Sequence, residues 1–164
     1  MFTLVRNVTM MKSSKLLATI LGSIFIVLLF VFVYPFKQVV FEAEGYDNLY
    51  LSPDSFELHW VHSIEKEEWF EVYEVVDDGL LLATSHFKTF GAGVPATSDK
   101  ETYLEDGYVV YVIENQYEDM HLNVSENVDT KVIQGDDEYL LYEWFDSYVS
   151  VKISIKRVPR IFRF

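Results

Sequence analysis

The feature that most constrains this chain is a long apolar run, residues 16–36, that contains no charged residue. A helix rises about 1.5 Å per residue, so about 20 such residues cross a hydrocarbon core of about 30 Å. Helix is the only structure that satisfies the backbone of a single segment in lipid. The run therefore predicts a transmembrane helix over residues 16–36. Pro35 is expected to end it, with Tyr34 and Phe36 at the lipid–water interface.

Two other interpretations of this run compete with a membrane-spanning helix. A buried core helix is disfavoured because the run is long and apolar on every face. A cleaved signal peptide fits the basic start and the apolar centre, but the run is long for that role. Residues 37–43, which follow the run, also lack paired small residues at the cleavage spacing. We therefore expect an uncleaved signal anchor, with the lipid bilayer as the partner of residues 16–36.

Basic residues flank the run unequally, because Arg6, Lys12 and Lys15 precede it and only Lys37 follows closely. Segments rich in Lys and Arg stay in the cytoplasm. We therefore expect residues 1–15 to be cytoplasmic, residues 16–36 to anchor the chain in the cell membrane, and residues 37–164 to form an extracytoplasmic domain.

The charges of the chain are also unevenly spread. All 26 acidic residues lie after Lys37, against nine of the 13 basic residues, which gives this part a net formal charge of −17. Such a domain repels nucleic acid and anionic lipid, so we exclude a nucleic-acid partner. The chain has no cysteine, which excludes disulfides, thiolate chemistry and Cys-ligated metals.

The densest strand pattern lies in residues 56–95. Apolar and polar residues alternate from Phe56 to His62, which is the period of a half-buried strand. Residues 69–76 are aromatic and branched, residues 77–79 (Asp-Asp-Gly) supply a left-handed position for a hairpin turn, and residues 80–90 return as a third strand. A glycine loop, residues 91–95, ends this meander.

The rest of the outer part repeats short strand signals separated by turns. Further strands are expected over residues 38–44, 49–51, 108–113, 120–124, 131–133, 139–145 and 149–155, whereas residues 96–107 read as irregular. No segment after residue 37 has a helical period. The pattern predicts an all-β domain, a small antiparallel β-sandwich or barrel preceded by one N-terminal transmembrane helix.

Several side chains within residues 56–95 could take part in catalysis or bind a ligand. His62 and Ser63 invite a nucleophile interpretation, but neighbours in a regular strand point to opposite faces, and there is no G-x-S-x-G elbow. A cation site would need three or four converging ligands. The spacing matches no standard metal motif, although acidic and histidine residues are dense here: His59, His62, Glu65, Glu67, Glu68, Glu71, Glu74 and His86. We expect no catalytic residue, no metal and no cofactor.

A pairing between two strands is a different possibility. If residues 56–63 and 69–76 form a hairpin, His62 could lie opposite Glu71 or a nearby residue. Such a pair would support the core or line a pocket. Gly91 and Gly93 are not a phosphate loop, because no helix follows them, but their backbone amides could hold an anion.

Residues 58–95 resemble the family called domain of unknown function 1850. The residues that carry this resemblance are His62-Ser63-Ile64, Glu71 within an aromatic strand, and Phe90-Gly91-Ala92-Gly93-Val94-Pro95. Glu68 departs from the pattern, since many members have proline near that position. The resemblance implies a bacterial or archaeal envelope protein, encoded beside TAXI-type TRAP transporters, which are solute uptake systems built from a permease and a binding protein.

The sequence thus predicts a single-pass, non-enzymatic accessory protein of the cell envelope, with a TRAP permease or its solute-binding protein as partner. Its expected binding residues are His62, Ser63, Glu71, Gly91 and Gly93. A domain that itself binds a small ligand or cation is the alternative, and a hydrolase is a third. The basic tail from Lys152 to Phe164 could contact lipid headgroups or an acidic partner, or simply be solvated or packed on its own domain.

Overall fold

The computed structural model describes the backbone of residues 2–90 and 100–159, and the side chains of residues 15–90 and 100–159. The chain divides into two compact units, one containing the N-terminal helix and the other spanning residues 37–157.

Helix α1 (Phe2–Val33) contains the apolar run. Its segment Lys15–Val33 has a mean hydropathy of 3.0 and no buried residue, so it is long and apolar enough to cross a membrane. The hydroxyls of Thr19 and Ser23 donate to carbonyls one turn earlier, each at 2.9 Å, as lipid requires of a polar side chain. The helix ends at Val33, two residues before Pro35 and three residues earlier than the expected span.

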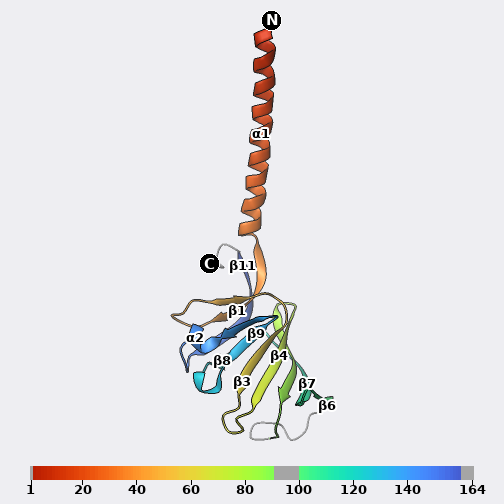
Figure 1. The fold of residues 1–164 in the computed structure, drawn as a ribbon, viewed down its shortest axis with the longest axis vertical. Helices are drawn as coiled ribbons and strands as arrows, with labels where there is room; N and C mark the ends of the chain where they lie inside the picture. Colours follow the sequence, from red (N-terminus) through yellow and green to blue (C-terminus); the bar gives the residue numbers. More distant parts are fainter. Residues whose placement is uncertain (1, 91–99, 160–164) are drawn as a thin grey trace. The chain divides into compact units, whose positions relative to one another are not determined.

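Residues 37–157 form a β-sandwich rather than a barrel, since their strands belong to two separate antiparallel sheets (Figure 1). The smaller sheet has the order β2-β1-β11-β8 and the larger has the order β10-β9-β3-β4-β5-β7-β6. The strands of the smaller sheet are β1 (Pro35–Glu42), β2 (Leu49–Leu51), β8 (Asp119–Asn123) and β11 (Ser150–Pro159). The strands of the larger sheet are β3 (Phe56–Val61), β4 (Glu68–Val76), β5 (Gly79–Phe87), β6 (Thr102–Glu105), β7 (Tyr108–Tyr117), β9 (Lys131–Gln134) and β10 (Asp137–Leu140).

One main core lies between the two sheets. Alternate residues of each strand point inward, so β1 contributes Val39 and Phe41 while β3 contributes Phe56 and Leu58. The rings of Phe41 and Phe56 meet edge to face at 5.8 Å, which joins the two sheets directly. Burial of these apolar side chains is the main source of stability for the sandwich.

Two segments depart from the sequence prediction. Residues 96–107 were expected to be irregular, yet Thr102–Glu105 forms β6, which pairs with β7. The two-residue turn between them, Asp106-Gly107, has φ values of 48° and 86°, which favours a tight hairpin. The expectation missed β6 because its flanks are polar and all of its residues are exposed.

The second departure lies at residues 139–145, which were expected to be a strand. Strand β10 ends at Leu140 and a short helix, α2 (Leu141–Trp144), follows. The helical turn places Leu141 and Phe145 on one side, and both are fully buried in the main core. Burial of two large side chains four residues apart therefore outweighs the strand propensity of this aromatic segment. A single 3-10 turn, η1 (Glu126–Val128), precedes β9.

The hairpin between β4 and β5 lies at the expected position, but Gly79 is not its left-handed residue. The left-handed residue is Asp77, with φ of 53°. Gly79 begins β5, and a Cβ added there would lie 2.8 Å from the backbone oxygen of Tyr117 in β7. Close approach of a neighbouring strand, rather than a left-handed conformation, is what requires glycine at this position.

Replacement of Gly79 by alanine should destabilise the sandwich. The added Cβ must displace the backbone of β7, because the contact is with a carbonyl rather than a flexible side chain. We expect a loss of about 1–3 kcal/mol in the free energy of unfolding, measured by urea denaturation. Asp136→Ala, in an exposed turn, serves as the control and should change stability by less than about 0.5 kcal/mol. Equal stability of the two variants would contradict the packing argument.

Candidate functional site

The antiparallel register of the larger sheet sorts its side chains into rows that cross several strands. The face that packs on the smaller sheet is called the inner face here, and the opposite one the outer face. An inner row crosses five strands through directly paired residues: Trp60, Trp69, Phe87, Val109 and Leu104. One position along, an outer row consists of His59, Phe70, His86, Val110 and Tyr103.

Glu71 occupies the inner face, one row further into the sandwich. It pairs with Leu58 on β3 and with Ser85 on β5. The hydroxyl of Tyr73 donates a hydrogen bond of 2.6 Å to the Glu71 carboxylate. The indole of Trp69 donates to the hydroxyl of Ser85 at 2.8 Å. Glu71 is therefore a carboxylate held between apolar and aromatic side chains, with one hydroxyl partner.

Burial sets the protonation of this pair. Removal from water raises the pKa of Glu71, and the hydrogen bond from Tyr73 only partly opposes this change. Burial also raises the pKa of Tyr73, and the neighbouring carboxylate adds to that rise. A carboxyl group with a raised pKa inside a domain is characteristic of sites that bind or transfer a charge.

His62 does not meet Glu71, contrary to the proposed cross-strand pair. The hairpin forms, but Leu58 is the residue opposite Glu71. The backbone of His62 instead exchanges hydrogen bonds of 2.8 Å with Glu67 and Lys66, closing the turn between β3 and β4. The pair with Glu71 does not form because β3 ends at Val61 and His62 begins the turn, four residues beyond Leu58; the residue opposite His62 in the hairpin is Glu67.

The imidazole of His62 has a structural task within this turn. Its Nδ1 accepts a hydrogen bond of 3.2 Å from the backbone N–H of Glu65, and its ring stacks on Trp69 at 5.9 Å. The carboxylate of Glu65 in turn accepts from the hydroxyl of Thr89 at 2.8 Å. These contacts fasten the turn to the end of β5 and leave Ser63 exposed to solvent. Gly91 and Gly93, the remaining expected binding residues, lie outside the described residues.

The outer row contains a polar cluster, of which the sequence analysis named His59, Glu68 and His86 as possible cation ligands without predicting that they lie together. His59 is only 6% exposed, and its ring stacks on Phe70 at 4.7 Å. His86 stacks on the other side of Phe70 at 4.1 Å. The two ring nitrogens of His59 face carboxylates, with Nε2 at 2.7 Å from Glu57 and Nδ1 at 3.2 Å from Glu68. An imidazolium would satisfy both contacts by donating two hydrogen bonds.

Tyr108 extends this cluster to β7. Its hydroxyl donates to the second oxygen of Glu68, and that hydrogen bond is the main reason why the pKa of Glu68 is lowered. Burial and the same carboxylate raise the pKa of Tyr108 to about 12. Burial lowers the pKa of His86, whose Nε2 lies 2.8 Å from the hydroxyl of Thr84. Alternation along each strand can be read from the sequence. Only the register between β3, β4 and β5 shows that the rings of His59, Phe70 and His86 lie side by side and stack.

Neither cluster forms a metal site. Among residues 15–90 and 100–159, no group of three or more His, Asp or Glu side chains could hold a metal ion. Serine chemistry also finds little support in the geometry. The His62 ring is engaged by Glu65, and the Ser85 hydroxyl accepts from an indole rather than facing a base.

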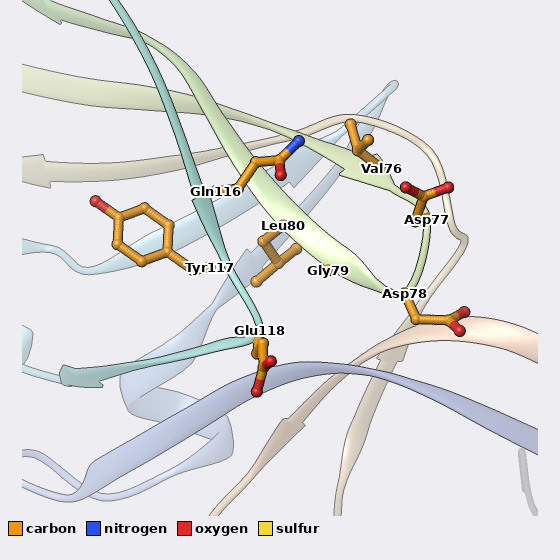
Figure 2. Close-up of a pocket in the computed structure, with 8 residues that line it drawn as sticks. All are labelled: Val76, Asp77, Asp78, Gly79, Leu80, Gln116, Tyr117 and Glu118. Atoms are coloured by element: carbon orange, nitrogen blue, oxygen red, sulfur yellow. The ribbon is translucent and has the colours of Figure 1, made fainter.

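An open groove of about 440 Å³ lies at the opposite end of the larger sheet (Figure 2). The β4–β5 turn and the end of β7 line it, and its acidic side chains are Asp77, Asp78 and Glu118. Lys37 and Arg157 approach the Asp78 carboxylate to 3.1 and 3.7 Å, and the hydrogen bond from Lys37 is the main cause of its lowered pKa. Bases of the same domain thus already neutralise part of the groove.

These observations define a class: a small antiparallel β-sandwich, preceded by one apolar helix, with a half-buried carboxylate on its inner face. Residues 56–141 match the family described as Domain of unknown function (DUF1850), and the chain belongs to that family. The match includes β3 to β10, and hence Glu71 and both rows. No curated protein and no solved structure matches the chain.

Replacement of Glu71 by glutamine should stabilise the domain at neutral pH. A glutamine amide oxygen can still accept the hydrogen bond from Tyr73, but it carries no charge to bury. Because the pKa of Glu71 is raised by folding, the native protein loses stability as pH rises through that pKa, and the variant lacks this loss. We expect a gain of about 0.5–2 kcal/mol at pH 7, and little gain at pH 4, from urea denaturation at both pH values.

The matched control for this substitution is Glu74→Gln, on an exposed position of the same strand. It should change stability by less than about 0.5 kcal/mol at either pH. If both variants behave alike, the burial of the Glu71 charge has no energetic consequence and the enclosed-carboxylate interpretation is wrong.

Proposed function

We propose that this protein is a single-pass, non-enzymatic accessory protein of the cell envelope. Its helix anchors it in the cell membrane, its N-terminus lies in the cytoplasm, and its β-sandwich acts outside the cytoplasm. Its partner is a TAXI-type TRAP uptake system, either the permease or the solute-binding protein. The parts of this proposal rest on different observations.

The observation that supports membrane anchoring is the exposed apolar helix. Every residue from Lys15 to Phe30 is exposed, so no part of the described domain covers this surface. A surface of this size in water would be very unfavourable, whereas lipid accepts it at no cost. The orientation follows from Arg6, Lys12 and Lys15, which precede the helix, and from the acidic residues, which all follow it.

The uptake system as partner is supported by the family. The resemblance of residues 58–95 implies a gene context beside TAXI-type TRAP transporters. The helix and the first strand are separated in sequence by Tyr34 alone, so no long linker joins the proposed anchor to the sandwich. A binding role also agrees with a domain whose described polar residues form hydrogen-bonded clusters rather than a nucleophile and a base.

A ligand-binding domain is the second candidate function. The enclosed Glu71, with its raised pKa, favours this alternative. Trp60 and Trp69, stacked at 5.6 Å, form an aromatic wall in the neighbouring row of the same face. A carboxylate beside indole faces suits an organic amine or another small cation.

The absence of cysteine makes the orientation directly measurable. Single cysteines at Asp136, in an exposed turn of the sandwich, and at Thr3, in the N-terminal segment, create two reporters with no background. A membrane-impermeant maleimide on intact cells should label Asp136→Cys and should label Thr3→Cys only after lysis. Labelling of Thr3→Cys on intact cells, with Asp136→Cys shielded, would reverse the proposed orientation.

The uptake partner is tested by affinity purification. A tagged TRAP permease, expressed with its binding protein, should retain the full chain but not a variant truncated after residue 36. A chimera that carries residues 37–164 on an unrelated single-span anchor is the matched control and should be retained as well. If the truncated chain is retained equally, the helix rather than the sandwich makes the contact. If nothing is retained, the association with the uptake system fails.

A further inference from the structure

Strand β6 forms an open edge of the larger sheet. It is the terminal strand on the β7 side, and no described strand pairs with its other side. All four of its residues are exposed. Natural proteins usually shield such edges with prolines, bulges or inward charges, because a free edge is a template for another strand. The inner-face residues of β6, Thr102 and Leu104, include no proline and no charged side chain, and the described β6–β7 pairing has no bulge.

The backbone of β6 presents its free groups at defined residues. The carbonyl of Glu101 accepts a hydrogen bond of 3.1 Å from the N–H of Val112, so Glu101 faces β7. Successive residues of an antiparallel strand direct their N–H and C=O to alternate sides. The N–H and C=O groups of Thr102 and Leu104 therefore point away from the sheet, ready to pair with an added strand.

The inner row gives the added strand an apolar requirement. This row runs through buried Phe87 and Val109 and ends at Leu104, which is 79% exposed. Phe90, 65% exposed, packs edge to face on Phe87 at 5.4 Å and adds to the same apolar end. An apolar side chain placed opposite Leu104 would continue the row and remove its last member from water.

The outer face gives the same strand a charge requirement. Glu101, Tyr103 and Glu105 alternate with the inner residues and so lie on the outer face, with exposed Asp106 following in the turn. Their charges complement lysine or arginine on the outer side of a partner. A second copy of this chain fits poorly, because antiparallel pairing of two β6 strands about Tyr103 places Glu101 opposite Glu105, which is repulsive.

We propose that β6 is a docking edge for an extended segment of a partner protein that alternates apolar and basic residues. The segment adds antiparallel or parallel to β6, its apolar side chains continue the inner row, and its basic side chains face Glu101 and Glu105. This mode is strand addition, in which main-chain hydrogen bonds give affinity and alternate side chains give specificity. The inference names a contact surface for the proposed accessory function, on which it rests for its biological context.

The test uses the full chain in detergent and a synthetic peptide of about eight residues that alternates lysine and valine. Binding should slow hydrogen exchange of the Thr102 and Leu104 amides, measured by NMR, and leave the Tyr103 amide unchanged because it faces β7. A peptide alternating glutamate and valine is the matched control and should bind at least about tenfold more weakly. Equal binding of the two peptides, or protection confined to other strands, would overturn the proposal.

Two substitutions separate backbone pairing from side-chain contact. Leu104→Pro and Leu104→Ala both remove the leucine side chain, but only proline removes the outward N–H. The proline variant should lose about tenfold more affinity than the alanine variant, while the β6–β7 pairing stays intact because that N–H does not face β7. Equal losses would show that side chains alone make the contact. The peptide assay needs neither a membrane nor an uptake system, so its failure leaves the proposed function standing. Likewise, failure of the association with the uptake system leaves the docking edge standing.

Discussion

The register between neighbouring strands is the constraint on which the rest of this sandwich depends. With Leu58 opposite Glu71 and Trp60 opposite Trp69, the carboxylate faces the core and the histidines face outward. A slip of one residue would exchange the faces, moving the tryptophans to the outer face and Glu68 and His59 to the inner face. The packing of the hydrophobic core thus determines more than stability, because it also decides which polar groups lie on the inner face and which stack on the outer face.

Two kinds of polar cluster result from this arrangement, and their energetics differ. On the outer face, His59, Glu68 and Tyr108 satisfy one another, so the cluster ties three strands together across Phe70. On the inner face, Glu71 is half-buried and accepts a hydrogen bond from one hydroxyl, that of Tyr73. The first cluster resembles the hydrogen-bonded support found in many sheets, whereas the second retains an unfavourable charge.

Much of this architecture could be predicted from residue patterns. The uncharged run and Pro35 indicated the helix and its end, and the alternation from Phe56 onward indicated β3 to β5 with nearly correct bounds. The two segments that were predicted wrongly are determined by their contacts rather than by their own residue pattern. Strand β6 has no apolar alternation and exists because β7 pairs with it, and α2 replaces a strand because Leu141 and Phe145 reach the core. Glu71 was named in advance as a binding residue, but its place on the inner face, its partner Tyr73 and the neighbours of His62 required the register.

The order of strands in the smaller sheet has a consequence for how the protein is made. Strand β1 lies between β2 and β11, which are the next strand and the last strand among the described residues. During synthesis, β1 leaves the ribosome early and waits for a partner encoded near the C-terminus. A sheet closed by its final segment has a large loop-closure entropy and folds slowly. The nascent domain therefore presents an incomplete hydrophobic surface until residues 150–159 have been made, and chaperones can bind that surface during this interval.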